Sequence, residues 1–147
     1  MHYYNRQFGF TGPLILSVAL VDLIWAAFAG PEIRMVLLPV GTIFLVLTAC
    51  FWHLEVEVKA DDLFVRFGPL PFFRTRRSLT GASAQVGRSD VLDGWGIHCV
   101  PGRSVIWNIH GFDCVEITLA DGRRIRVGTN DPQGLADAVN QAGGSRS

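Results

Sequence analysis

The chain has 147 residues, of which 49% are hydrophobic, and its 13 basic and 13 acidic residues cancel to a formal net charge of zero. A chain this apolar is atypical of soluble globular domains, and its neutral balance offers nucleic acid no overall attractive field. The average conceals two halves, because nearly all charged residues lie after residue 53. The sequence therefore predicts a membrane-associated segment followed by a polar domain, with no nucleic-acid partner.

Two long apolar segments, residues 8–29 and 35–52, lie back to back near the start of the chain. Each approaches the ~20 residues that a helix needs to cross a bilayer. The intervening residues 30–34 suffice for a tight turn, so residues 1–53 are predicted to form a two-helix transmembrane hairpin. A cleaved signal peptide is the alternative for the first segment. Its apolar run, however, exceeds the about 7–15 residues of a signal sequence, and a second apolar segment follows at once.

Basic residues at the ends of the two segments predict the orientation of the hairpin. Arg6 precedes the first segment, whereas the turn carries only Arg34, which Glu32 offsets. The basic residues that follow the second segment are Lys59, Arg66, Arg74, Arg76 and Arg77. Since basic residues collect on the cytoplasmic side of a membrane, both termini are expected in the cytoplasm. The expected location is a bacterial inner (cell) membrane that the chain crosses twice, with membrane lipids around both spans.

Asp22 is the one ionisable residue inside the predicted spans, where a carboxylate costs on the order of 2.5–3.5 kcal/mol. Counted from the turn, Thr42 lies at a similar depth on the second span, and the neighbouring Gly41 favours close helix approach. Asp22 and Thr42 are therefore predicted to join the two helices, and a proton or ion site is the alternative. Amphipathic side chains expected to anchor the spans at the membrane interface are Tyr3, Tyr4, Trp52 and His53.

From residue 54 onward, apolar and polar residues alternate with a period of two, which is typical of half-buried strands. Turn signals, of which the Asp-Gly pair at residues 121–122 is the strongest, separate about seven such segments. A helix is predicted over residues 132–142, because Asp131 is a good N-cap and Leu135 and Val139 recur at helical spacing. The predicted domain, residues 54–142, is an antiparallel β-barrel or sandwich capped by this helix, and residues 143–147 form a tail.

This order of strands and a final helix resembles the pleckstrin-homology (PH) superfold. The stretches that carry a closer resemblance are residues 94–97 (Gly-Trp-Gly-Ile), 113–119, 121–129 and 131–132. They resemble the bacterial PH-domain family that carries a short two-helix membrane anchor. The resemblance implies a PH-like domain of unknown function rather than an activity. His98 departs from the family pattern, in which Arg is expected after the Gly-Trp-Gly-Ile run.

The sequence contains no motif of a serine hydrolase, a zinc protease, a phosphate-binding loop or a thiol enzyme. The cysteines lack the spacing of a metal site and are expected to be reduced and buried: Cys50, Cys99 and Cys114. We therefore expect no enzyme activity, no metal and no cofactor. A subunit of a membrane enzyme or transporter, built around Asp22 or His98, is a third hypothesis.

A segment rich in aromatic and basic residues follows the second predicted strand: Phe72, Phe73, Arg74, Arg76 and Arg77. At an anionic leaflet such phenylalanines could insert, and each cation would contribute ~1 kcal/mol. The leading hypothesis is a membrane-tethered, non-catalytic PH-like scaffold that faces the cytoplasm and binds a protein partner or itself as a homo-oligomer. The alternative is a peripheral sensor of anionic lipids that uses residues 72–77.

Overall fold

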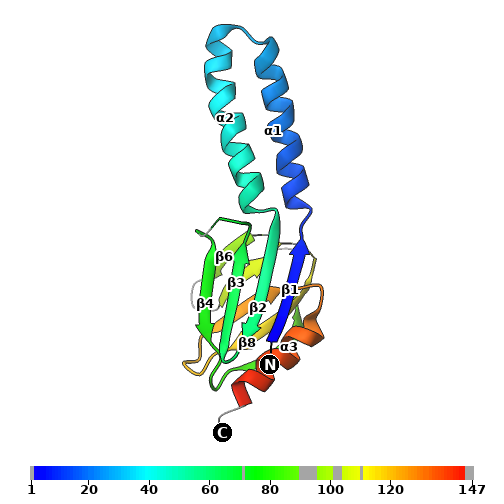
Figure 1. The fold of residues 1–147 in the computed structure, drawn as a ribbon, viewed down its shortest axis with the longest axis vertical. Coiled ribbons are helices and arrows are strands. Elements are labelled where there is room, and N and C mark those ends of the chain that lie inside the picture. Colours follow the sequence, from blue (N-terminus) through cyan, green and yellow to red (C-terminus); the bar gives the residue numbers. More distant parts are fainter. Residues whose placement is uncertain (1, 71, 90–95, 101–103, 110, 145–147) are drawn as a thin grey trace.

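The structure of this protein is a computed structural model that describes residues 2–70, 72–89, 96–100, 104–109 and 111–144. Two helices, α1 (Thr11–Phe28) and α2 (Pro31–Cys50), project from one end of a β-rich domain (Figure 1). The domain contains a four-stranded sheet, a five-stranded sheet and a third helix, α3 (Pro132–Gly144). The predicted order of an apolar helical pair, a run of strands and a terminal helix is confirmed, except that a strand also precedes the helical pair.

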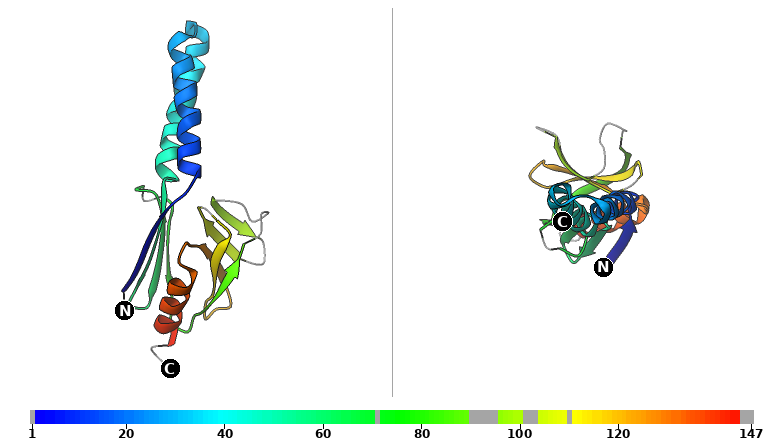
Figure 2. Two further views of the ribbon diagram at one scale, coloured as in Figure 1. Left: turned by 90° about the vertical axis from the view of Figure 1, so that its right-hand side faces the viewer. Right: turned by 90° about the horizontal axis from the view of Figure 1, so that it is seen from above.

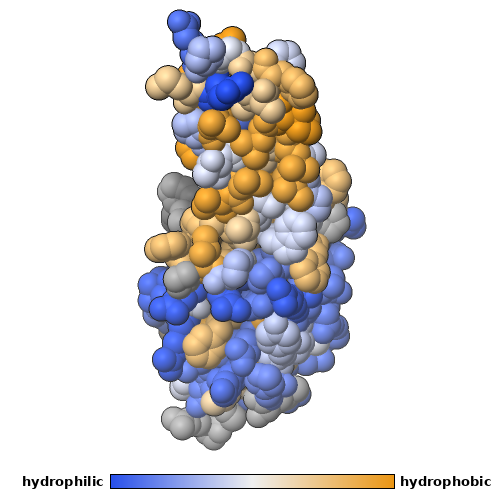
Figure 3. All heavy atoms as spheres, turned by 45° about the horizontal axis from the view of Figure 1, so that its top comes forward, coloured by the Kyte–Doolittle hydropathy of each residue, from blue (hydrophilic) through white to orange (hydrophobic). Residues whose placement is uncertain are grey.

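The helical pair is long enough and apolar enough to cross a membrane. At 1.5 Å per residue, α1 and α2 measure about 27 and 30 Å, which matches the ~30 Å hydrocarbon core of a bilayer. Only 17% of each apolar stretch is buried, unlike the core helices of soluble proteins. Below its hydrophilic tip, the hairpin shows a largely hydrophobic surface, which gives way to hydrophilic surface over the domain (Figure 3).

The helices begin at other residues than the sequence predicts. α1 begins at Thr11 rather than at residue 8, because Phe8 ends a strand and pairs with His53. α2 begins at Pro31 rather than at residue 35, since a proline has no N–H to leave unpaired in the first turn. At the tip, the Arg34 guanidinium donates hydrogen bonds of 3.1–3.3 Å to carbonyls at the end of α1 and just after it, those of Ala26, Ala27 and Ala29. These bonds satisfy acceptors that a helix end would otherwise leave open.

The four-stranded sheet is antiparallel throughout and follows chain order. Its strands are β1 (His2–Phe8), β2 (His53–Lys59), β3 (Asp62–Phe67) and β4 (Arg74–Ser78). The sequence predicts no strand before the first helix, because two of the three inward positions of β1, Asn5 and Gln7, are polar. Asn5 and Gln7 nevertheless find partners: Asn5 donates to the Asn130 side chain over 2.8 Å, and Gln7 donates to the Gly128 carbonyl over 2.5 Å.

The predicted boundary at residues 53 and 54 therefore does not separate hairpin from domain. The β-rich domain also contains residues 2–8, which pair along their full length with β2. The helical hairpin is accordingly residues 11–50 rather than 1–53. Strands β1 and β2, which pair with each other, directly precede and follow the hairpin, so both helices are attached to the same sheet.

The five-stranded sheet has the order β5-β8-β9-β7-β6. Its strands are β5 (Ser83–Arg88), β6 (Gly96–Val100), β7 (Ser104–Asn108), β8 (Asp113–Thr118) and β9 (Arg124–Gly128). β7 and β9 are parallel, so this sheet is mixed rather than antiparallel as predicted. The described residues thus contain nine strands, where about seven were predicted. The Asp121-Gly122 turn joins β8 to β9, with Gly122 at a φ of +80°, whereas residues 90–95 and 101–103 lie outside the described part.

The core lies between the two sheets, which face each other (Figure 2). Phe67 of the first sheet stacks on Trp107 of the second, with ring centroids 5.8 Å apart. α3 closes the sandwich at the end away from the hairpin, packing on β5, β8, β1 and β2. Its Leu135 and Val139 are fully buried, which confirms the predicted apolar stripe. The helix runs to Gly144, two residues past its predicted end at residue 142.

Candidate functional site

The four-stranded sheet continues the helical hairpin without a flexible linker. Only residues 9–10 join β1 to α1, and only residues 51–52 join α2 to β2. Gly68, just after β3, donates its N–H to the His53 carbonyl over 2.8 Å. Its backbone packs so tightly on the last turn of α2 that an added Cβ would collide with the Ala49 and Cys50 carbonyl oxygens. The sheet is therefore held at a fixed height relative to the helix ends.

The outer face of this sheet carries a row of charged residues nearest to the hairpin. Strand pairing places Arg6 opposite Glu55, Glu55 opposite Arg66, and Arg66 opposite Arg74. These four residues, one from each strand, form what we call the arginine row. Directly opposed residues on a sheet share a face and lie within side-chain contact of each other. Three guanidinium groups and one carboxylate thus meet on one surface.

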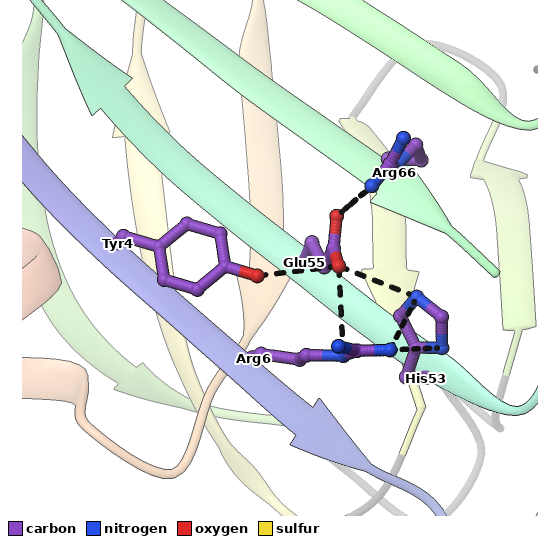
Figure 4. A network of polar contacts seen from close by, with 5 residues as sticks. All are labelled: Tyr4, Arg6, His53, Glu55 and Arg66. Atoms are coloured by element: carbon purple, nitrogen blue, oxygen red, sulfur yellow. Dashed lines mark hydrogen bonds and ion pairs between the residues drawn. The ribbon is translucent and has the colours of Figure 1, made fainter. Parts of the chain in front are cut away.

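Glu55 is the centre of a polar network on this face (Figure 4). Its side chain is only 12% exposed, and it accepts hydrogen bonds from two Arg66 nitrogens, the Nε at 3.0 Å. Arg6 Nε lies 3.5 Å from Glu55 Oε1, and the Tyr4 hydroxyl donates to the same oxygen over 3.2 Å. His53, in the next row toward the hairpin, places its Nε2 3.4 Å from that oxygen. One carboxylate therefore holds two arginines in place.

The network moves the pKa values of two of its members. Burial by itself raises the pKa of Glu55, but the hydrogen bond and charge of Arg66 outweigh it, so that pKa is lowered and the carboxylate is ionised. Burial lowers the pKa of His53, and the positive charge of Arg6 lowers it further. A neutral imidazole also fits the geometry, since an Arg6 nitrogen lies 3.4 Å from His53 Nδ1, which can then accept.

The lowered pKa of His53 predicts acid sensitivity. The unfolded chain takes up a proton near the ordinary pKa of 6.5, whereas folded His53 resists it, so stability should fall as pH drops below about 6.5. Thermal unfolding of the full chain in detergent at a series of pH values measures this slope. His53→Gln should flatten the slope between neutral pH and pH ~5. An unchanged slope in His53→Gln would contradict this assignment.

A hollow of 540 Å³ adjoins the arginine row on the same face. It is lined by side chains from all four strands, among them Tyr4, Glu57, Phe64, Arg74 and Arg76. Arg76 is paired with Asp62 at 2.6 Å and lies over the Phe64 ring. Arg74, by contrast, makes no ion pair or side-chain hydrogen bond with any residue that the structure describes. The hollow thus borders on one arginine whose charge is available to a ligand.

The structure divides the predicted aromatic and basic segment between two faces. Arg74 and Arg76 lie on the outer face, whereas Arg77 pairs with core residue Leu63 and is half-buried on the inner side. Phe73 turns inward, 5.7 Å from the Phe51 ring, and Phe72 is 79% exposed. The five residues therefore do not form one membrane-facing edge. Side chains two residues apart on a strand share a face, so Arg74 and Arg76 lie together and Arg77 lies on the opposite face. The same alternation would have grouped Arg74 with Arg76 in the sequence analysis.

The predicted contact between Asp22 and Thr42 does not form. Thr42 is exposed and donates its hydroxyl to the Leu38 carbonyl of its own helix over 2.7 Å. Asp22 instead faces Gly41, where an added Cβ would lie 2.7 Å from its Oδ2. That oxygen is buried and has no hydrogen-bond donor among the described residues. Depth alone therefore predicted the wrong neighbour, because successive helix positions point 100° apart.

The predicted interface anchors lie in different places. Tyr3 and Tyr4 are at the far end of β1 from the hairpin, and their hydroxyls contact Asp131 and Glu55, respectively. His53 is buried in the Glu55 network rather than extended toward an interface. Trp52 lies at the base of α2 and is 38% exposed, as an interfacial side chain would be.

No group of His, Cys, Asp and Glu able to hold a metal ion occurs among the described residues. Cys50 and Cys114 are buried free thiols. The side chain of His98, named above as an alternative reactive group, lies outside the described part. The arginine row was missed in the sequence because its members are far apart in the chain, and only strand register aligns them. Comparison with protein-family models, curated proteins and solved structures finds no match to this chain.

Proposed function

We propose that this protein is a membrane-anchored, non-catalytic binding module that presents the outer face of its four-stranded sheet next to the membrane surface. The helical hairpin spans a bacterial inner membrane, and both termini lie in the cytoplasm. The observation that carries the proposal is the linker-free junction, with two residues between each helix and its strand. A recognition face that is fixed in height and orientation needs less ordering upon binding than one on a flexible tether.

The charge pattern supports the orientation. Strand pairing places the arginines of the arginine row near the hairpin end of the sheet, while the tip of the hairpin carries Glu32 and an Arg34 that donates to helix carbonyls. Basic residues beside a span favour the cytoplasmic side. We also propose a PH-like domain, supported by two facing sheets and a C-terminal helix that closes one end of them.

Binding at this face can be tested by photo-crosslinking of the full chain in native membranes. A photoreactive residue at Phe64 or Tyr4, which share a row across the sheet, should yield the same adduct with another molecule. The matched control is Gln141, an exposed position on α3 away from this face, and it should yield none. Equal adducts at Phe64 and Gln141, or none at Phe64 and Tyr4, would contradict the proposed function.

The molecule bound at this face is either a lipid of the adjacent membrane or a protein, namely a partner or a second copy of this chain. The hollow favours the protein. Its lining joins the aromatic Tyr4 and Phe64 to charged residues, a combination enriched in protein interfaces. The product crosslinked at Phe64 or Tyr4 distinguishes the two kinds of molecule. A crosslinked protein shifts the electrophoretic band by the mass of that protein, whereas a crosslinked lipid causes no shift of that size.

A further inference from the structure

Charge on the outer face of the four-stranded sheet is unevenly distributed along the strands. The arginine row has three guanidinium groups against one carboxylate. The next row away from the hairpin balances one carboxylate with one Lys or Arg, and so does the row after it, which also contains His2. The two rows are Tyr4, Glu57, Phe64 and Arg76, then His2, Lys59, Asp62 and Ser78. Among these three rows, the excess of Lys and Arg charge is thus confined to the one nearest to the helix ends.

The arginine row lies close to the polar zone of a bilayer. It is two residues, or about 7 Å at 3.3–3.4 Å per strand residue, beyond the Phe8–His53 pair, and residues 9–10 and 51–52 separate that pair from the helix ends. Headgroups extend roughly 5–7 Å outside the hydrocarbon core on each side. An arginine side chain can bridge the remaining distance while its stem covers apolar surface. Exposed Phe8, Trp52 and Phe72 at the same end of the domain provide that surface.

From this arrangement we propose that the arginine row binds phosphate groups of anionic phospholipids in the leaflet beside which the domain is held. The inference rests on the proposed function and specifies its ligand. Planar guanidinium groups suit phosphate oxygens, with which they form paired charge-assisted hydrogen bonds. Glu55 positions Arg6 and Arg66 and neutralises part of their charge, so Arg74 supplies the strongest free contact.

Position within the fold favours a lipid over a soluble phosphate compound. The row runs across strands that extend roughly along the direction of the helices, so it lies roughly parallel to the membrane plane (Figures 1 and 2). Headgroups of one leaflet form such a plane of phosphates. The attraction falls off within a Debye length, about 8 Å at physiological salt, so only the row nearest to the membrane contributes.

The test uses the full chain reconstituted in nanodiscs that contain phosphatidylcholine and phosphatidylglycerol. Native mass spectrometry then counts the lipids of each class that the released protein retains. We expect enrichment of phosphatidylglycerol on the unmodified chain. Arg74→Gln should reduce the enrichment about five-fold, because one cation near an anionic surface contributes ~1 kcal/mol. Arg74→Lys keeps the charge and should retain most of the enrichment. Because Arg74 has no partner among the described residues, its substitution leaves the fold intact, which thermal unfolding verifies.

Arg77→Gln is the matched control, since it removes the same charge from the same strand but on the inner face. Arg124→Gln, on the other sheet, is the second control, and neither should alter the lipid ratio. Equal retention of both lipid classes, or a ratio that Arg74→Gln leaves unchanged, would overturn the lipid inference. So would displacement of the lipid by inorganic phosphate in detergent, which would assign the row to a soluble phosphate ligand. A protein adduct at Phe64 with equal lipid retention would refute the inference while the proposed function stands.

Discussion

Replacement of residues 9–52 with Asn-Gly should yield a soluble, cooperatively folded β domain. Phe8 and His53 are directly paired at the ends of β1 and β2, and Asn-Gly is a favoured two-residue connection between antiparallel strands. The exposed apolar surface of the hairpin disappears with it. A fragment that begins at His53, without β1, should aggregate or remain unfolded. Far-UV circular dichroism and urea unfolding compare the two variants.

The expected difference is large because β1 supports the domain in two ways. Its seven residues pair with β2, and each lost backbone hydrogen bond costs ~1 kcal/mol. Asn5 and Gln7 also join the first sheet to the end of β9 and the segment that follows it. The combined loss is comparable with the roughly 5–15 kcal/mol by which a domain is stable. A fragment from His53 as stable as the Asn-Gly variant would show that β1 contributes little.

Gly68→Ala should destabilise the full chain by several kcal/mol. Gly68 has a φ of +60°, and a side chain there costs about 1–2 kcal/mol in backbone strain alone. The new Cβ would also collide with two carbonyl oxygens at the end of α2, where the backbone cannot move aside cheaply. Thermal unfolding of the full chain in detergent measures the loss.

Two comparisons separate strain from collision. Gly122 has a φ of +80° but open space around it, so Gly122→Ala should show the strain alone. In the soluble Asn-Gly variant, α2 is absent, and Gly68→Ala should then cost no more than Gly122→Ala. A Gly68→Ala penalty of equal size with and without α2 would mean that the junction between sheet and hairpin is loose.

The helices and the overall order of elements could be predicted because their signals are local. Length and hydrophobicity indicate two spans, and an N-cap with a helical stripe indicates α3. β1 could not be predicted in this way, because Asn5 and Gln7 face inward and are satisfied by residues more than 120 positions away. An alternating apolar pattern, the usual evidence for a strand, is absent where polar partners replace the core.

The candidate site depended on register, which the sequence does not display. Arg74, Arg76 and Arg77 were all identified as candidates. That Arg77 lies on the inner face, opposite to the other two, can be inferred only once β4 is known to be a strand. Arg6 and Arg66 joined the site because β1, β2 and β3 align them with Glu55. In the hairpin, counting residues gave the depth of Asp22 but not its direction, and direction determines which neighbour it meets.

The central claim is that the hairpin crosses a bilayer and holds the arginine row at headgroup level. Electron paramagnetic resonance of nitroxide labels in liposomes tests it, since oxygen concentrates in the hydrocarbon and a nickel chelate stays in water. We expect oxygen to dominate at Val21 and Ile43, the nickel chelate to dominate at Ser78, and Arg74 to lie between them. Nickel access at Val21 and Ile43, or equal access at Arg74 and Ser78, would contradict the account.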